Sequence, residues 1–297
     1  MSVTEKEAGL KLNNIVVATD FGAAAEAATE YASSLAKHFS SKLTLVNVLD
    51  LSVASRSEAG MAGWPIEQMR EDGLANLTRT SNHLKSEKIH VSTKELESHT
   101  PAAAIVSMAE RTGADLVVMG TTSRQGLSRW IVGSCAEGVI HHTKCPVLTL
   151  GPKAKKQEKD KFHLRNVVFA TDLNHQSVEK AALALGFAKE GLSKLYLCSI
   201  LDNAGTDISN SIYRQLDAEA ELRKLVPGPA YEWCSPEFVV EFGDVAERIV
   251  ALAKRTDADL IVLGARESAS YFTRMAKGVV EHVLAEATCP VMTICAD

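Results

Sequence analysis

The stretch Asn14-Ile-Val-Val-Ala-Thr-Asp20 decides the fold, because it returns later in the chain as Asn166-Val-Val-Phe-Ala-Thr-Asp172. In both copies a short apolar run ends in Thr-Asp, which is typical of a parallel strand that is buried on both faces and followed by a polar turn. A stretch that returns after 152 residues indicates an internal duplication. The chain of 297 residues is therefore expected to hold two copies of one domain.

Three further blocks extend the repeat outward from this stretch. The block next to it keeps the offset of 152 residues, and the two later blocks are offset by 144: Leu43–Asp50 with Leu195–Asp202, Thr112–Gly120 with Thr256–Gly264, and Lys144–Leu150 with Thr288–Ile294. The second copy has therefore lost eight residues in its middle. A deletion confined there indicates tolerant surface between blocks that belong to the core.

Between the blocks, apolar residues recur with the spacing of helices. Three such stripes occur in the first copy, the last less apolar than the others: Ala28, Tyr31, Ala32 and Leu35; Ile105, Met108 and Ala109; Leu74, Leu77, Ser81 and Leu84. Strands and helices thus alternate, and right-handed crossovers give an α/β fold of two tandem, doubly wound, five-stranded parallel-sheet domains. The last strand of each copy leaves an apolar edge, so we expect the two copies to cover each other as an internal pseudo-dimer.

The duplication also sets the expected domain boundaries. We expect an N-terminal tail over residues 1–12, a first domain over 13–151, a linker over 152–163 and a second domain over 164–297. Residues 151–161 contain five lysines, two acids and no large apolar side chain, which favours a solvated linker over a basic binding arm.

Composition excludes several classes of protein. Lys+Arg 32 against Asp+Glu 37 gives a net charge of −5, which argues against a nucleic-acid partner. No run approaches the roughly 18 apolar residues of a membrane span, and the start of the chain lacks the apolar region of a signal peptide, so we expect a cytoplasmic protein without a membrane partner. The six cysteines form no CxxC pair and the His–Cys spacings of the two copies differ, so buried thiols are expected and no metal site.

The loop after Gly120 carries the clearest binding signal. Gly120 is followed by Ser123 and, after nine more residues, by Gly133-Ser134. An apolar pattern typical of a helix resumes shortly afterwards, at Val139-Ile140. A helix that starts at Gly133-Ser134 would direct its unpaired N–H groups and positive dipole end into the crevice beyond the carboxyl ends of the strands. This is a seat for a phosphate group, to which Ser134 adds a hydroxyl.

With these residues the chain resembles the universal stress protein family, as a tandem two-domain member of Rossmann-like, adenine nucleotide alpha hydrolase-like fold. ATP-binding members carry an Asp at the end of the first strand and G-x2-G-x9-G-(S/T) after the fourth. The resemblance covers both copies, nearly the whole chain. It implies that ATP or AMP binds in the first domain and that the bound state biases conformation or partner choice in a stress-response or signalling role.

By this resemblance, Asp20 and the backbone of Val48 would read adenine, Gly120 would lie under the ribose and phosphates, and Gly133 and Ser134 would hold the phosphates. The full set of expected contacts is Ala18, Thr19, Asp20, Val48, Met119, Gly120, Ser123, Gly133, Ser134 and Cys135. A divalent ion with the phosphates and further association between chains stay open.

Ser123 departs from the family pattern, which has glycine at that position. A positive φ at a non-glycine residue costs roughly 1–2 kcal/mol, and 1.4 kcal/mol is about tenfold in affinity. Ser123 is therefore expected to weaken nucleotide binding without removing the site.

The second copy departs further. Counting from Gly264 places Glu267 at the second glycine, Lys277 at the third, and Gly278 where Ser belongs. A carboxylate facing a phosphate at ~4 Å costs roughly 4 kcal/mol at an effective dielectric constant of ~20. Although Asp172 and Ile200 still match the adenine end, we interpret this copy as a degenerate site kept for packing.

Several of these residues have plainer alternative roles. Asp20 precedes an Ala-rich helix and is also a good N-cap. Arg124 and Arg129 are either solvated or reach the phosphates, and His141 and His142 lie where they complement the dipole at a helix end.

Three common catalytic signatures are absent from the sequence. The chain has no G-x-x-x-x-G-K-[ST], no G-x-G-x-x-G after its first strand and no G-x-S-x-G. We therefore expect a binding protein with no catalytic residues, in which any ATP turnover is slow and incidental. Two alternatives stay open: an interaction module of the same family that binds no nucleotide, and a slow nucleotide hydrolase.

Overall fold

The computed structural model describes residues 9–52, 66–121, 132–155, 162–202, 208–266 and 273–296. In the first half the strands are β1 (Asn14–Ala18), β2 (Lys42–Asp50), β3 (His90–Ser98), β4 (Leu116–Gly120) and β5 (Val147–Leu150), and the helices α1 (Ala23–Phe39), α3 (Ile66–Ser86), α4 (Pro101–Thr112) and α5 (Ser134–His142). In the second half the strands are β6 (Asn166–Ala170), β7 (Lys194–Leu201), β8 (Glu237–Phe242), β9 (Leu260–Arg266) and β10 (Val291–Ala296), and the helices α6 (Ser177–Gly191), α7 (Ile208–Lys224), α8 (Val245–Arg255) and α9 (Thr273–Glu286), with a short 3₁₀ helix over Gly228–Glu232.

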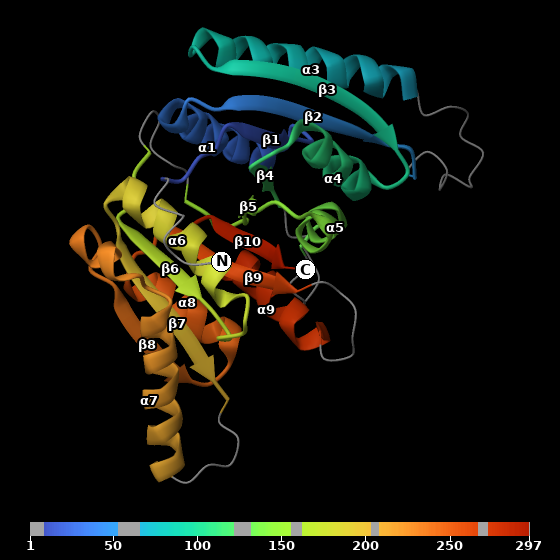
Figure 1. Cartoon of the computed structure of the whole chain (residues 1–297). Helices are drawn as coiled ribbons and strands as arrows, with labels where there is room; N and C mark the ends of the chain where they lie inside the picture. The colour runs from blue at the N-terminus through green and yellow to red at the C-terminus, as the bar shows by residue number, and fades with distance from the viewer. Residues whose placement is uncertain are drawn as a thin grey trace.

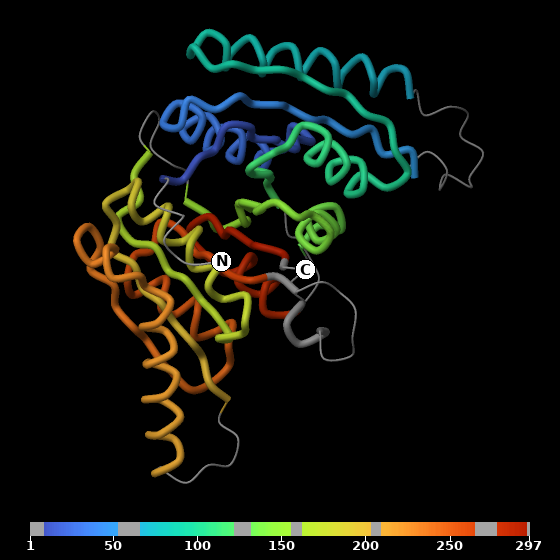
Figure 2. The backbone as a smooth tube through the Cα atoms, viewed as in Figure 1, coloured from blue at the N-terminus to red at the C-terminus, as the bar shows by residue number. Residues whose placement is uncertain are grey.

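All these strands form one sheet in the order β3-β2-β1-β4-β5-β10-β9-β6-β7-β8. Within each half the strands are parallel, and the halves meet where β5 and β10 pair antiparallel, with Leu148 opposite Met292. The chain trace passes from blue to green on one side of this junction and from yellow to red on the other (Figures 1 and 2). The predicted α/β fold and the mutual covering of the apolar edges are thereby confirmed.

Helices cover both faces of the sheet. One core cluster joins β1 to α1 and α3 through side chains such as Val17, Leu35 and Leu77, and it continues under α6 and α7. The other lies beneath α4, α5, α8 and α9 and includes Val16 and Met108. Neighbouring residues of β1 thus face opposite layers, as the continuous apolar run predicts.

The helical stripes are buried as predicted, with one exception. Ala28, Tyr31, Ala32 and Leu35 of α1 and Ile105, Met108 and Ala109 of α4 are all buried. In α3, Leu77, Ser81 and Leu84 are buried, whereas Leu74 is 48% exposed because α3 covers the outer edge of the sheet, where a helix has fewer neighbours (Figure 1).

The duplication extends to individual hydrogen bonds. The Asp115 carboxylate accepts from the N–H of Asn14 at 2.9 Å, and the Asp259 carboxylate accepts from the N–H of Asn166 at 3.0 Å. Each acid ties the start of one strand to the turn that leads into its neighbour. The two halves therefore share their hydrogen-bonded framework as well as their strand order.

The described ends of the linker contact both halves. Lys155 donates to the Asp257 carboxylate at 2.8 Å, and the Phe162 ring lies 4.5 Å from the ring of His38 and 5.7 Å from that of Phe39. Residues 156–161 lie outside the described residues.

None of the described helices is both long and apolar enough to cross a membrane.

Candidate functional site

The reversal of strand order in the first half lies between β1 and β4. These strands are parallel neighbours, and Ala18 is in register with Met119 on β4 and with Val46 on β2. Val48 follows two residues beyond Val46. The predicted contacts Ala18, Met119 and Val48 therefore meet at the carboxyl edge, where doubly wound sheets bind their ligands.

A tight turn leads from β1 into α1. The Thr19 hydroxyl accepts from the Phe21 N–H at 3.0 Å, and the Asp20 carboxylate accepts from the Gly22 N–H at 2.9 Å. Phe21 has a φ of 61°, which is uncommon for a bulky residue. The N-cap of α1 is Gly22 rather than Asp20, so Asp20 stabilises the turn that precedes the helix and keeps its exposed carboxylate at the crevice.

The last long helix of this half starts as predicted, at Ser134 with Gly133 as N-cap. The Gly133 N–H donates to the Thr121 hydroxyl at 3.1 Å, which fixes the helix start next to the end of β4. The first amides of a helix have no acceptor inside it, and those of Ser134 and Cys135 have no other acceptor among the described residues. This first turn is therefore able to bind an anion.

Gly120 and Gly133 differ in what a side chain would meet. A Cβ on Gly120 would lie 2.2 Å from the carbonyl oxygen of Ala24, so close packing of β4 against α1 already requires glycine there. Among the described residues, a Cβ on Gly133 would meet only the Thr121 hydroxyl, at 3.8 Å, and Gly133 has an ordinary φ of −57°. The described fold thus leaves the space in front of Gly133 open.

Acidic groups surround the start of α5. Burial, and after it the carboxylates of Asp20 and Asp50, together raise the pKa of the Cys135 thiol to about 11. Asp50, at the end of β2, therefore lies near enough to the first turn of α5 to act on it. Sequence reasoning missed Asp50 as a site residue, although its recurrence as Asp202 was a signal, and it missed Thr121, for which there was none.

Ser123, Arg124 and Arg129 lie outside the described residues. Of the predicted contacts, the structure brings together those at the ends of β1, β2 and β4 and the start of α5.

The corresponding crevice of the second half has the same turn between its first strand and helix, but it differs in what packs against the glycine at the end of β9. The Thr171 hydroxyl accepts from the Leu173 N–H at 3.1 Å, and Leu173 has a φ of 58°, as in the first half. A Cβ on Gly264 would lie 2.7 Å from the ammonium nitrogen of Lys180, a buried residue of α6. A lysine side chain thus occupies the place held in the first half by the backbone of α1. Glu267 and the side chain of Lys277 lie outside the described residues.

The paired histidines lie in the last turn of α5. Nδ1 of His142 is 2.7 Å from the Gly138 carbonyl oxygen, and Nε2 of His141 is 3.8 Å from the Glu281 carboxylate across the junction. The contact of His142 lies within the end of α5, where a histidine also complements the helix dipole, whereas the contact of His141 joins α5 to α9. Over the part of the chain that the structure describes, no group of three or more His, Cys, Asp or Glu residues is arranged to hold a metal ion.

Comparison with known proteins gives consistent matches. The model of the universal stress protein family matches residues 11–150 and 163–294. A universal stress protein of Methanocaldococcus jannaschii is 35% identical over 147 residues, which are 48% of this chain and 84% of that protein. The crystal structure of a universal stress protein from Archaeoglobus fulgidus superposes with a TM-score of 0.71 at 18% identity, covering 96% of this chain and 97% of that one. A protein of unknown function from Pseudomonas aeruginosa gives a TM-score of 0.63 at 17% identity, covering 96% and 93%.

Proposed function

The chain belongs to the universal stress protein family, and from this premise we propose that its first domain binds an adenine nucleotide, ATP or AMP. The single observation that supports this most is Gly133. Neither its backbone conformation nor its described surroundings require glycine, whereas a phosphate that approaches the backbone closely does.

In this proposal each part of the crevice has its own task. The amides of Ser134 and Cys135 and the Ser134 hydroxyl bind the phosphates. The Asp20 carboxylate, which faces solvent beside the end of β1, accepts a hydrogen bond from the adenine amino group, and the backbone of Val48 pairs with the base. The protein is then a binding protein whose nucleotide-bound state selects a partner in a stress response, and catalysis is not part of the proposal.

One observation favours a second function. Asp20 and Asp50 both act on the first turn of α5, and two carboxylates there oppose the binding of a phosphate chain. This favours an interaction module that carries no nucleotide, which is the competing hypothesis.

Calorimetric titration of the purified chain with ATP and with AMP tests the proposal. We expect saturable binding that Gly133→Asp abolishes, because a carboxylate then stands at the phosphate seat. Lys277→Asp, at the corresponding position of the second half, should leave binding unchanged and serves as the matched control.

No binding at millimolar ATP would refute the proposal and favour the interaction module. Binding that survives Gly133→Asp would place the nucleotide elsewhere. ATP turnover above roughly 1 s⁻¹, the low end of typical enzymes, would instead indicate a hydrolase.

A further inference from the structure

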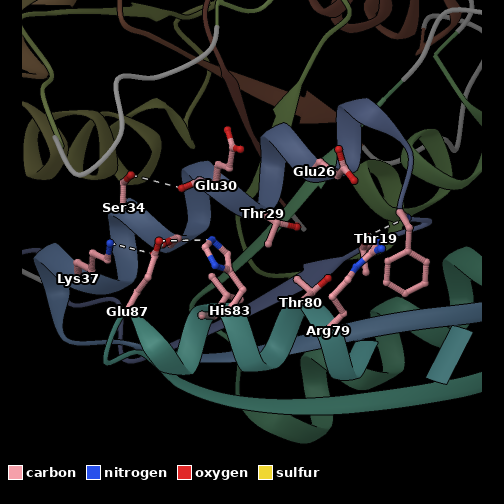
Figure 3. A pocket seen from close by; sticks show the side chains of 13 residues that line it. Thr19, Glu26, Thr29, Glu30, Ser34, Lys37, Arg79, Thr80, His83 and Glu87 are labelled. Carbon is pink, nitrogen blue, oxygen red and sulfur yellow. Dashed lines mark hydrogen bonds and ion pairs between the residues drawn. The ribbon is translucent and has the colours of Figure 1, made fainter. Parts of the chain in front are cut away.

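A cavity of the first half lies between α1 and α3, on the other side of the β1–α1 turn from the start of α5 (Figure 3). It has a volume of about 570 Å³, within the ~300–1,000 Å³ of small-molecule sites. Polar side chains from both helices line it, together with Thr19 and Phe21 of the β1–α1 turn. We call this cavity the α1–α3 groove.

At one end of the α1–α3 groove, the basic side chains are already paired with a carboxylate. The Glu87 carboxylate is 3.0 Å from the ammonium of Lys37, 3.4 Å from Nε2 of His83 and 3.2 Å from the Ser33 hydroxyl, which donates to it. Lys37 and Ser33 hold the pKa of Glu87 below its ordinary value despite its burial. The cations at this end therefore already have an anionic partner.

Arg79 stands at the other end. In Figure 3 its side chain extends from α3 toward Thr19, with Thr80 and Thr29 beside the same space, while Glu30 extends away from α3. Among the described residues, Arg79 takes part in no ion pair or hydrogen bond. A guanidinium that faces a cavity without a carboxylate partner is suited to bind a carboxylate or phosphate through two parallel hydrogen bonds.

The second half shows which residues occupy the corresponding positions when no polar groove is present. At the offset of 152 residues, Thr29 and Ser33 correspond to Ala181 and Leu185 of α6, both of which are buried in the core cluster. A valley between two packed helices is ordinarily filled by such apolar side chains. The first half instead keeps hydroxyl groups and an open volume at these positions.

From these observations we infer that the α1–α3 groove is a second small-molecule site, for a metabolite that carries one carboxylate or phosphate group and at least one hydroxyl or amino group. Arg79 binds the anionic group. Thr29 already donates its hydroxyl to the Ala25 carbonyl oxygen at 2.8 Å, so it is left as an acceptor for the donor of the ligand, and Glu26 on the rim is a second acceptor. Because Thr19 and Phe21 flank Asp20, this site and the nucleotide crevice share one turn.

The experiment uses glycerol 3-phosphate and lactate as probes of the two anionic groups, with sodium chloride at equal ionic strength as the blank. Amide chemical shifts of the ¹⁵N-labelled full chain are followed during each titration. We expect saturable shifts centred on Thr80 and Phe21 with at least one probe, and the probe that saturates identifies the anionic group. Arg79→Gln should weaken its binding at least tenfold, because a charge-assisted pair is lost.

Three controls make the result decisive. Lys85→Gln removes an exposed cation from the same helix outside the groove and should leave binding unchanged. Ser33→Leu installs the residue of the second half and should abolish binding by filling the groove. Gly133→Asp should have no effect, because it alters the nucleotide crevice. Non-saturating shifts, equal losses in Arg79→Gln and Lys85→Gln, or loss in Gly133→Asp would each overturn the inference.

Discussion

At the scale of single residues, the two glycines Gly120 and Gly133 have different reasons to lack a side chain: one is required by packing, and the other is explained by the proposed ligand. The Cα of Gly120 lies against the backbone at the start of α1, so its missing side chain is explained by packing alone. Gly133 has no such neighbour among the described residues. A binding motif read from sequence therefore contains residues of both kinds, and only coordinates distinguish them.

The first prediction tests this distinction with the duplicated pair Gly120 and Gly264. Gly120→Ala should lower the free energy of unfolding by about 1–3 kcal/mol, the cost of overpacking against a rigid neighbour. Gly264→Ala should cost clearly less, because its new methyl group meets the flexible end of Lys180. Urea denaturation of both variants measures the difference, and equal losses would contradict the assigned contacts.

The sequence contained the elements of the site but not their chemical surroundings. The helix start at Ser134 followed from the pattern of glycines and apolar residues, because capping is local. Asp50 at the end of β2 lies near Cys135 of α5, the helix that connects β4 to β5. These residues are far apart in the sequence, so no local pattern predicts that they are neighbours. Likewise Arg79 and Thr29 are each unremarkable in sequence, and they share a cavity only because α1 and α3 lie side by side.

At the scale of elements, α5 connects the crevice to the junction between the halves. Its first turn carries Cys135 beside the acids, and a Cβ on Gly138 would lie 2.6 Å from that of Ala102, so the helix packs closely on α4. Its last turn contacts Glu281 of α9 through His141. A change at either end of this helix acts on a single rigid element.

The second prediction concerns the thiol in that first turn. With a pKa of about 11, only about one Cys135 side chain in a thousand is a thiolate at pH 8, against roughly a quarter for a free cysteine of pKa about 8.5. Because the raised pKa favours the neutral thiol, alkylation by iodoacetamide should be at least tenfold slower than in the unfolded chain and should accelerate about tenfold per pH unit from pH 7.5 to 9.5. Peptide-resolved mass spectrometry measures it, and a rate that levels off near pH 8.5 would contradict the raised pKa.

At the scale of the whole molecule, the duplication produces one sheet rather than two. Antiparallel pairing of β5 with β10 removes the open edge of each half. One core cluster includes Leu148 and Leu150 of β5 together with Met292 of β10, so apolar packing continues across the junction. The halves are therefore expected to unfold together although each repeats the same fold.

The third prediction tests that coupling at Gly151, where a Cβ would lie 2.0 Å from the carbonyl oxygen of Leu284 in α9. Gly151→Ala should force the first half away from the second and cost about 1–3 kcal/mol, so that the slowest amides of β1 and β6 exchange about five- to more than a hundredfold faster in hydrogen-exchange measurements. Gly228→Ala, whose methyl group meets no atom of the described residues within 4 Å, is the matched control and should change neither strand. If only one half loses protection in Gly151→Ala, the junction holds together two domains that are independently stable. Equal acceleration in both strands would instead show that the shared sheet is the unit of stability, because damage at its centre then reaches both ends alike.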